Sequence, residues 1–198
     1  MPQRTKEALA ASLKILLCEK PLNKITISEL TESCGINRMT FYYHFKDIYD
    51  LVGWICMEDA YRALEGNRSL ENWVQGLENL VDAMYADKAF IISAYYSIEQ
   101  EKIEKYLYRV IDDLAKIAIS DVDGLDRISE SDKQFICDFY NYAMMGLLFQ
   151  WIREDMPDTR AEMVERITTI MDGKLQQSVR LFALKNLRHE KERLKENN

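Results

Sequence analysis

TISELTESCGINRMTFYYHFKDIYDL, residues 26–51, is the stretch of this sequence that decides the fold. Thr26 followed by Glu29 fits a capping box, in which the side chains and backbone N–H groups at a helix start exchange hydrogen bonds. An apolar stripe over two turns follows, and Gly35 supplies the left-handed residue that ends such a helix. The chain is then expected to turn, with Asn37 capping a second short helix.

The second helix is predicted to be anchored by one face only. Phe41 and Phe45 lie one turn apart and can pack into a core together. The other face combines hydrogen-bond donors, flat rings and cations, where a solvated helix normally carries Glu and Lys. Its residues are Arg38, Met39, Thr40, Tyr42, Tyr43, His44 and then Lys46. A short helix presented outward after a Gly-containing turn is the geometry of a helix-turn-helix reader in the DNA major groove. The alternative is an ordinary amphipathic helix pair inside an all-α core.

These residues resemble the signature of a known family. The segments TISEL, CGIN and TFYYHFK, followed by Leu51, are similar to the DNA-binding signature of the TetR family of transcriptional regulators. The resemblance implies an all-α homodimer that binds double-stranded DNA. An N-terminal three-helix helix-turn-helix DNA-binding domain, residues 1–48, would precede a larger helical dimerisation and effector domain, residues 49–198. The chain is also similar to the dihydroxyacetone kinase regulator subgroup, in which control can pass through a partner protein instead of a small molecule.

The resemblance also implies which side chains meet DNA. Arg38, Met39 and Tyr43 would face bases. The residues that would mainly touch backbone phosphates are Thr26, Thr40, Tyr42, His44 and Lys46, and Asn37 at the helix start completes the predicted DNA-binding set. One position departs from the family pattern, because members usually carry a Lys two residues after Lys46, where this chain has Ile48. The sequence therefore does not support a phosphate contact by the next helix.

Composition favours long helices. A chain of 198 residues with 47% hydrophobic residues can bury one or two cores, and only seven Gly and three Pro leave little for loops or strands. No apolar run approaches the ~20 residues of a membrane span, and the N-terminus lacks the apolar core of a signal peptide. A cytoplasmic protein with no membrane partner is expected. Four scattered cysteines with apolar neighbours predict buried reduced thiols, and only two His leave no basis for a metal site or a cofactor.

Charge is distributed unevenly along the chain. Residues 1–46 hold seven Lys or Arg and four Asp or Glu, which leaves nineteen and twenty-nine in residues 47–198. The basic residues 1–46 can neutralise DNA phosphates locally, and the acidic residues 47–198 limit non-specific binding to DNA. A chance fluctuation of surface charge is the alternative.

Helical periodicity continues through the rest of the sequence. The expected helices cover residues 4–20, 47–66, 69–84, 87–96, 103–119, 131–154 and 159–182, with starts at Ser69, at Ser131 with Gln134, and at Thr159 with Glu162. The helix that begins near Asp47 joins the predicted DNA-binding unit to everything downstream. Residues 121–129 are expected to be a polar connection.

The last two expected helices carry more apolar surface than one neighbour covers. Gly146 in mid-helix costs about 1 kcal/mol against Ala, which is easiest to understand if another backbone approaches there. The resemblance implies that these helices pair with their copies in a four-helix dimer interface. The predicted interface residues are Phe139, Gly146, Met163, Ile167, Ile170 and Val179. The alternative is that both helices only complete the monomer core.

An effector pocket is predicted from aromatic residues, since ligand sites are mostly apolar with a few polar tips. The candidates are Trp54, Tyr61, Tyr95, Tyr96, Tyr142 and Phe149. Their alternative role is ordinary core packing. The sequence does not say whether the effector is a small molecule or a partner protein.

An enzyme and a protein-interaction adaptor are the alternatives to a DNA-binding regulator. An enzyme would need a nucleophile with an oriented base or a metal constellation, and neither stands out, so no enzymatic activity is expected. A helical protein-interaction adaptor that uses the surface of Tyr42 and Tyr43 remains an alternative, because aromatic residues also mark protein interfaces. The interpretation favoured by the sequence is a dimeric, sequence-specific transcriptional regulator that binds an inverted-repeat operator under effector control.

Overall fold

The computed structural model describes residues 2–66, 72–98, 100–120, 122–157 and 159–196, and these residues form helices and connections without a strand. The α-helices are α1 (Pro2–Glu19), α2 (Ile27–Ser33), α3 (Arg38–His44), α4 (Ile48–Ala63), α5 (Trp73–Ala86), α6 (Lys88–Ser97), α7 (Gln100–Ile119), α8 (Glu130–Arg153), α9 (Arg160–Met171) and α10 (Lys174–Glu196). Two short 3-10 helices are η1 (Leu22–Lys24) and η2 (Leu125–Arg127). The predicted all-α fold class is confirmed. No helix in the described part of the chain is both long and apolar enough to cross a membrane.

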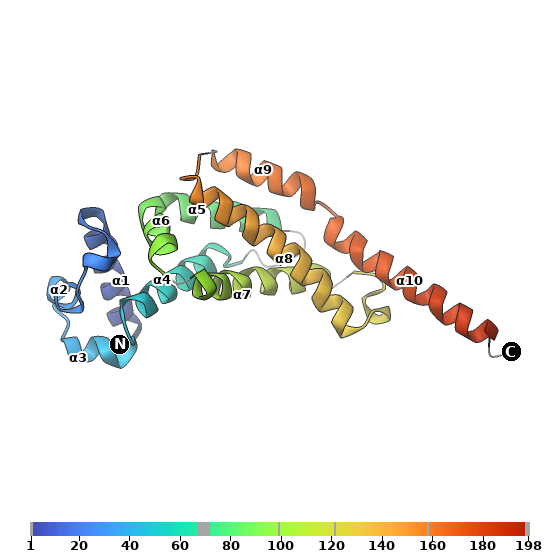
Figure 1. Cartoon of the computed structure of the whole chain (residues 1–198), viewed down its shortest axis with the longest axis horizontal. Coiled ribbons are helices and arrows are strands. Elements are labelled where there is room, and N and C mark those ends of the chain that lie inside the picture. The colour runs from blue at the N-terminus through green and yellow to red at the C-terminus, as the bar shows by residue number, and fades with distance from the viewer. Residues whose placement is uncertain (1, 67–71, 99, 121, 158, 197–198) are drawn as a thin grey trace.

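The molecule is elongated (Figure 1). Helices α1, α2 and α3 form one end, and the C-terminal part of α10 projects at the other. Helix α4 runs from the α3 end into the middle, where it packs against α5 and α7. Helix α8 packs along α7 and also touches α10, while α9 packs against α5. Helix α4 is therefore the continuous connection between the N-terminal helices and the rest of the bundle.

Three clusters of buried side chains hold these helices together. The N-terminal cluster buries Leu9, Leu30 and Phe41 completely and extends to α4 and α6. The central cluster joins α4, α5, α7, α8 and α9 around Leu148. The distal cluster joins α7, α8 and α10 around Val179. Helix α4 therefore shares one core with the N-terminal helices and another with the rest of the bundle.

The start of α2 and the start of α4 follow the local sequence signals. Thr26 Oγ1 accepts a hydrogen bond from the Glu29 backbone N–H at 3.2 Å, while the Glu29 carboxylate pairs with the Lys20 ammonium group. Asp47 Oδ1 accepts from the Asp50 backbone N–H at 2.8 Å and caps α4. Each cap satisfies a backbone donor that the helix itself leaves free. These caps fix where the chain enters and leaves the helix-turn-helix segment.

Several expected helix limits differ from the structure: α7 begins at Gln100 instead of residue 103, and α4 ends at Ala63 instead of residue 66. Ser129, not Ser131, caps α8, because its Oγ accepts from the Asp132 backbone N–H at 3.1 Å. The single C-terminal helix expected from residue 159 to 182 is divided into α9 and α10, since Gly173 between them adopts a left-handed φ of 66° that a continuous helix does not contain. The predicted start at Ser69 lies outside the described residues.

The four cysteines are free thiols, and only one of them is fully buried. Burial raises the pKa of Cys137 to about 11, so this residue is a neutral thiol near pH 7. Cys34 and Cys56 are half-buried, and Cys18 is exposed on α1. The prediction of a buried thiol is therefore wrong for Cys18, which lies outside the apolar stripe that α1 turns toward the core.

Candidate nucleic-acid interface and ligand cavities

Helix α3 presents one face to the N-terminal core and the opposite face to solvent. Asn37 caps it, with Oδ1 accepting from the Met39 backbone N–H at 2.7 Å. Phe41 and Phe45 are 0% and 3% exposed, and their ring centroids lie 5.9 Å apart. The turn before α3 uses Gly35 at a φ of 67°, as expected from the sequence. The two buried rings fix the rotation of α3 about its axis and thereby fix which side chains point outward.

The outward face of α3 is formed by Arg38, Met39, Tyr42 and Tyr43. Met39 is 76% exposed and Tyr43 is 82% exposed, although both are large and mainly apolar. Arg38 Nη2 donates to Tyr42 Oη at 3.2 Å, and the guanidinium group lies over the Tyr42 ring, 5.6 Å from its centroid. This face combines a cation with two tyrosine hydroxyls and no side chain that would repel DNA. It can therefore offer both hydrogen bonds and apolar contact to base edges.

The other predicted DNA-binding residues lie around this face. Thr26 and Lys46 are exposed, whereas Thr40 and His44 are half-buried. The rings of Tyr43 and His44 are in edge contact with centroids 5.0 Å apart. These residues come from the start of α2, from α3 and from the connection to α4. The predicted set is thus distributed along one continuous part of the helix-turn-helix unit.

The start of α4 offers no cation to a phosphate. Ile48 is 8% exposed and packs in the N-terminal cluster. Asp47 and Asp50 occupy the first turn, and the Lys46 backbone N–H donates to Asp50 Oδ2 at 3.0 Å. Two carboxylates here would repel a phosphate group rather than bind it. The departure from the family pattern at Ile48 is therefore explained by a core role for this side chain.

The N-terminal helices are fastened to the bundle by polar and aromatic contacts. Lys14 Nζ of α1 lies 2.8 Å from Asp59 Oδ2 of α4 and 2.5 Å from Asp87 Oδ2, between α5 and α6. Burial by itself lowers the pKa of Lys14, but the hydrogen bonds with both carboxylates outweigh it and raise the pKa above its usual value. The Trp54 ring of α4 lies 5.8 Å from the Phe45 ring. The structure thus places Trp54 at the junction between α3 and α4, which differs from its predicted place among pocket aromatics.

An apolar cavity, here called the α4 cavity, lies among α4, α5, α6, α7 and α8. Its volume is about 100 Å³. Tyr95 and Phe149, two predicted pocket residues, both line it, with ring centroids 5.7 Å apart. Gly53 of α4 also lines it, and a Cβ added there would lie 2.6 Å from Cε2 of Tyr106. The missing side chain at Gly53 is what allows the Tyr106 ring to approach the α4 backbone.

The remaining predicted pocket residues do not line the α4 cavity. Tyr96 is 65% exposed, and its hydroxyl donates to the Arg153 carbonyl at 3.3 Å. Tyr142 is 63% exposed and borders a surface depression that Tyr95 and Phe149 also reach. Tyr61 is half-buried on α4. The structure therefore gathers Tyr95, Tyr142 and Phe149, and the Tyr96 ring lies in edge contact with Tyr95, with centroids 5.2 Å apart. Trp54 and Tyr61 line neither the α4 cavity nor this depression.

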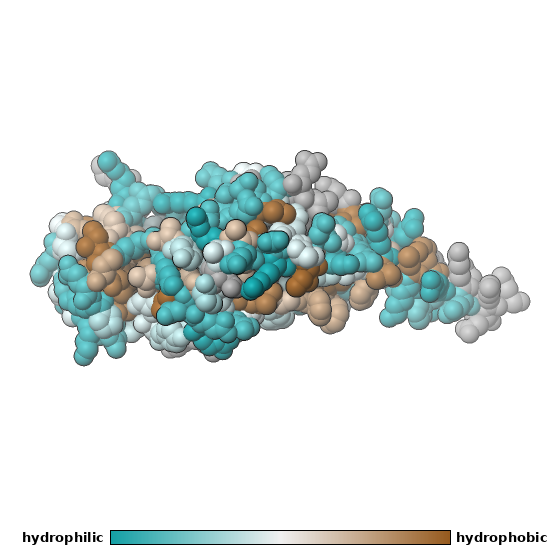
Figure 2. Space-filling view, turned by 90° about the horizontal axis from the view of Figure 1, so that it is seen from above, coloured by the Kyte–Doolittle hydropathy of each residue, from teal (hydrophilic) through white to brown (hydrophobic). Residues whose placement is uncertain are grey.

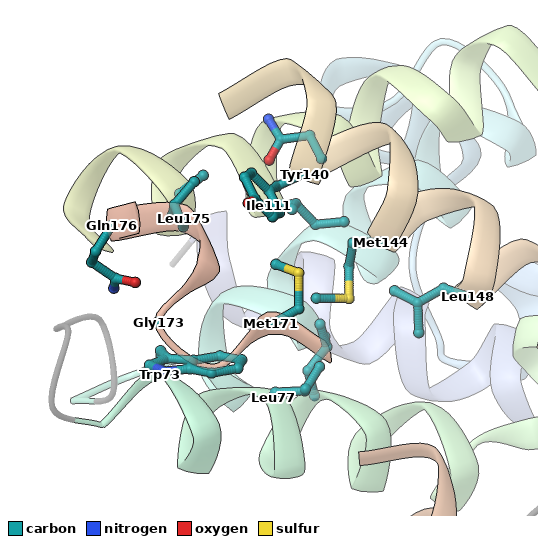
Figure 3. Close-up of a pocket in the computed structure, with 13 residues that line it drawn as sticks. Trp73, Leu77, Ile111, Tyr140, Met144, Leu148, Met171, Gly173, Leu175 and Gln176 are labelled. Atoms are coloured by element: carbon teal, nitrogen blue, oxygen red, sulfur yellow. The ribbon is translucent and has the colours of Figure 1, made fainter. Parts of the chain in front are cut away.

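A second cavity, here called the distal cavity, lies among α5, α7, α8, α9 and α10 (Figure 3). Figure 3 shows Trp73 and Leu77 on one side and Ile111 and Tyr140 on the other. The side chains of Met144 and Met171 point into the space between them (Figure 3). The volume of the cavity is about 80 Å³.

Two amide side chains line the distal cavity, and neither is among the residues predicted from the sequence. Asn141 is 0% exposed, and Gln176 is half-buried on α10. A signal was present for Asn141, because it occupies the same inward stripe of α8 as Cys137 and Leu148. A polar residue at a core position needs a partner or a ligand.

Apolar residues also gather on the outer surface of α8 and α10. This apolar stripe consists of Phe135, Phe139, Tyr142 and Leu147 of α8 with Leu181 and Leu184 of α10, each at least 44% exposed. Figure 2 shows hydrophobic groups on the projecting part of the molecule that α10 forms. Gly146 lies within the stripe, and a Cβ added there would meet nothing within 4 Å in the chain. The predicted interface residues Phe139 and Ile170 are exposed, at 64% and 66%.

Three predicted interface residues need correction. Met163 and Ile167 of α9 are 7% and 2% exposed, and Val179 of α10 is 0% exposed. They belong to the central and distal clusters, so neighbouring helices of the same chain already cover them. The outward side chains of α10 are Leu181 and Leu184, which lie on the opposite side of the helix from Val179.

Comparison with known proteins agrees with this architecture. A TetR C-terminal family model, described as "Transcriptional regulator C-terminal region", matches residues 71–173, just over half of the chain. The chain is 23% identical over 145 residues to the HTH-type dhaKLM operon transcriptional activator DhaS of Lactococcus lactis subsp. lactis (strain IL1403), covering 72% of this chain and 76% of that protein.

Solved structures show the same fold. The dihydroxyacetone kinase operon activator DhaS superposes with a TM-score of 0.68 at 20% identity, covering 90% of this chain and 97% of that one. A TetR transcriptional regulator from Rhodococcus sp. RHA1 gives a TM-score of 0.58 at 12% identity, with coverages of 87% and 98%. NalD of Pseudomonas aeruginosa, the secondary repressor of the MexAB-OprM multidrug efflux pump, gives 0.57 at 15% identity, with coverages of 85% and 96%. The family match over half of the chain confirms the resemblance seen in the sequence, and the protein belongs to the TetR family of transcriptional regulators.

Proposed function

We propose that this protein is a cytoplasmic homodimer that binds an inverted-repeat DNA operator and whose affinity for that operator is set by an effector, either a small molecule or a partner protein. Residues 1–48 would act as the DNA-binding domain and residues 49–198 as the dimerisation and effector domain. The observation that carries the proposal is the outward face of α3. Its side chains are large and exposed, and Phe41 and Phe45 hold the helix from behind.

The exposed side chains suggest a division of roles on DNA. Arg38 can donate two hydrogen bonds to a guanine edge, and Met39 and Tyr43 can contact the apolar parts of neighbouring bases. Thr26, Thr40, Tyr42, His44 and Lys46 would donate hydrogen bonds or positive charge to backbone phosphates. The Asn37 oxygen is occupied by capping, which leaves its amide N–H groups for a phosphate. In this proposal Arg38, Met39 and Tyr43 read the bases directly, and the surrounding residues bind the phosphate backbone.

The apolar stripe supports the proposed homodimer. Six large, mainly apolar side chains are exposed on two neighbouring helices, and exposed apolar patches mark protein interfaces. A second copy related by a two-fold axis would cover the stripe with the same residues. Such a dimer would hold two α3 helices at a fixed separation. The proposed operator therefore has two-fold symmetry, with half-sites about one helical turn or somewhat more apart.

Salt dependence tests the proposed DNA binding. The logarithm of the affinity for duplex DNA is expected to fall linearly with the logarithm of the salt concentration, because each phosphate contact releases counterions. Lys46→Ala should weaken all sequences alike and reduce the slope by about 2 in a dimer that makes one such contact per protomer. Filter binding or fluorescence anisotropy across a salt series measures both quantities.

A matched control separates this result from a general charge effect. Lys174→Ala removes an exposed lysine from the start of α10, far from α3, and should leave the slope unchanged. The competing adaptor function, in which Tyr42 and Tyr43 bind another protein, predicts little sensitivity to salt and no duplex binding. Wild-type protein that fails to bind duplex DNA at low salt would favour the adaptor.

Effector control is proposed to act through α4. This helix contributes Ile48 and Leu51 to the N-terminal cluster and Ala60 to the central cluster, and it also lines the α4 cavity. A ligand or partner can shift DNA binding only by preferring one placement of α4 over another. The close approach of Gly53 to Tyr106 makes α4 sensitive to small changes of volume at this point.

Gly53→Ala tests this route without knowledge of the effector. The new methyl group would lie 2.6 Å from the Tyr106 ring, so α4 or the ring must move. Operator affinity is expected to fall about tenfold, while base preference stays the same because α3 is untouched. The double variant Gly53→Ala with Tyr106→Leu should regain affinity, since the shorter side chain relieves the contact. If the single variant folds with the Tyr106 ring in its wild-type place and still binds operator like wild type, α4 displacement is not coupled to DNA binding.

A further inference from the structure

We infer that the distal cavity is a binding site for a small, neutral aromatic molecule that donates hydrogen bonds. The inference names a ligand class for the effector domain, and only its consequence for DNA binding rests on the proposed function. Two side-chain oxygen atoms support this inference. Asn141 Oδ1 and Gln176 Oε1 are both buried and both lack a hydrogen-bond partner among the described residues. Both side chains line the same cavity.

A hydrogen bond to Asp112 fixes the orientation of the Asn141 amide. Its Nδ2 donates to Asp112 Oδ1 at 3.2 Å, and Asp112 is only 8% exposed. Lys116 Nζ lies 2.6 Å from Asp112 Oδ2, and Gln134 Nε2 also approaches the Asp112 carboxylate, at 3.4 Å. Rotating the amide by half a turn would place Oδ1 against the carboxylate, where two acceptors repel each other. Asn141 therefore keeps its oxygen as the amide group without a hydrogen-bond partner.

Gln176 supplies the second acceptor from another helix. Its amide lies at the edge of the cavity between Leu175 and Trp73 (Figure 3). Burial of an amide oxygen without a hydrogen bond is costly, so a donor brought by a ligand would recover that cost at each position. Because Asn141 belongs to α8 and Gln176 to α10, a molecule with a donor at each side would bridge the two helices.

The walls of the cavity set the rest of the ligand's chemistry. The other lining residues are mainly apolar, with the Trp73 ring on one side and the Met144 and Met171 side chains pointing into the space (Figure 3). Methionine sulfur packs favourably against aromatic rings, which suits a flat ring in this position. The cavity volume of about 80 Å³ is several times the ~10–15 Å³ that one water needs. We therefore limit the inferred ligand to a single substituted ring.

Charge excludes ionic ligands from this class. Among the described residues that line the cavity there is no Lys, Arg, His, Asp or Glu. The carboxylate behind Asn141 is already paired with Lys116. A carboxylate or phosphate would face two amide oxygens without a compensating cation, and an ammonium group would lack a free counter-charge. The ligand must therefore be neutral, with hydroxyl or N–H donors.

The helices that line the distal cavity also carry the apolar stripe. Helix α8 turns Asn141 and Met144 into the cavity and Phe139 and Tyr142 out to the apolar stripe. Helix α10 likewise turns Gln176 inward and Leu181 outward. A ligand that draws α8 and α10 together would also change the shape of the stripe.

Resorcinol and m-xylene are matched probes for this site. Both are disubstituted benzene rings of nearly the same shape, but only resorcinol has hydroxyl donors. Saturable binding of each probe to the full-length protein is measured by titration calorimetry. Gln176→Met keeps the side-chain length but removes the Oε1 acceptor, and it should weaken resorcinol about fivefold while leaving m-xylene unchanged or tighter. Gln177→Met, on the adjacent exposed position of α10, is the control and should change neither probe.

A larger side chain in the cavity wall gives a second, independent test that the probes bind in the distal cavity. Ala115→Leu places extra carbon atoms in the cavity wall and should abolish binding of both probes. The inference is overturned if wild-type protein shows no saturable resorcinol binding, if Gln176→Met weakens both probes equally, or if folded Ala115→Leu protein binds both as before. Operator affinity measured with and without resorcinol addresses the proposed function separately, because a probe can occupy the cavity whether or not the protein binds DNA.

Discussion

Replacing Gly146 by leucine is expected to convert the dimer into a monomer at micromolar concentration and to lower operator affinity about 100-fold or more. The residue lies in the apolar stripe of α8, and nothing in its own chain approaches within 4 Å of an added Cβ. Leucine also favours a helix by about 1 kcal/mol over glycine, so the protomer should remain folded. Any loss of association must then come from contact with a second copy. Analytical ultracentrifugation and circular dichroism measure the two properties separately.

The control for Gly146→Leu is a leucine added to an exposed helical position away from the stripe. Ala89→Leu on α6 meets this need, because Ala89 is exposed and the substitution changes no charge. It should leave both the oligomeric state and the operator affinity unchanged. Phe139→Glu, which places a charge within the stripe, should reproduce the monomer. A wild-type protein that sediments as a monomer at micromolar concentration would contradict the proposed interface.

Arg38→Ala is expected to cost about 1 to 3 kcal/mol of operator binding per half-site and to relax the sequence preference at one base pair in each. The side chain is exposed and contacts Tyr42 on the same helix, so its removal leaves Phe41, Phe45 and the core unchanged. The loss should therefore concern recognition and not folding. Competition binding with a series of single-base operator variants measures both the affinity and the preference.

The comparison with Lys46→Ala decides what Arg38 does. A base contact makes Arg38→Ala lose more affinity on operator than on random duplex, whereas a phosphate contact lowers both equally. Lys46→Ala is expected to behave in the second way. Equal losses on operator and random DNA for Arg38→Ala would remove it from the proposed base-reading set and leave it as a phosphate contact.

The helix-turn-helix unit could be predicted because its signals are local. The Thr26 and Asn37 caps, the left-handed turn at Gly35 and the pair Phe41 and Phe45 each depend on residues within a few positions of one another. Once these fix the helices, the outward face of α3 follows from helical geometry alone. The same reasoning placed the start of α4 at Asp47, where the structure has it.

The orientation of the C-terminal helices could not be predicted in the same way. Helix α8 is apolar on both faces, with Leu148 fully buried and Phe139 64% exposed, so periodicity does not separate inside from outside. The break at Gly173 depends on the packing of α9 and α10 against different neighbours. Periodicity therefore predicts an interface role for Val179, although this residue is core. It does not pair Asn141 with Asp112, because Asp112 comes from another helix.

Selection from a pool of random-sequence duplexes tests most directly whether this protein reads a two-fold symmetric DNA sequence through α3. After several rounds with the wild-type protein, sequencing of the bound DNA should reveal an inverted repeat whose half-sites are centred about one helical turn or somewhat more apart. Selection with Arg38→Ala should yield the same repeat with one degenerate base pair per half-site. A wild-type selection that enriches no common sequence, or one without two-fold symmetry, would contradict the account.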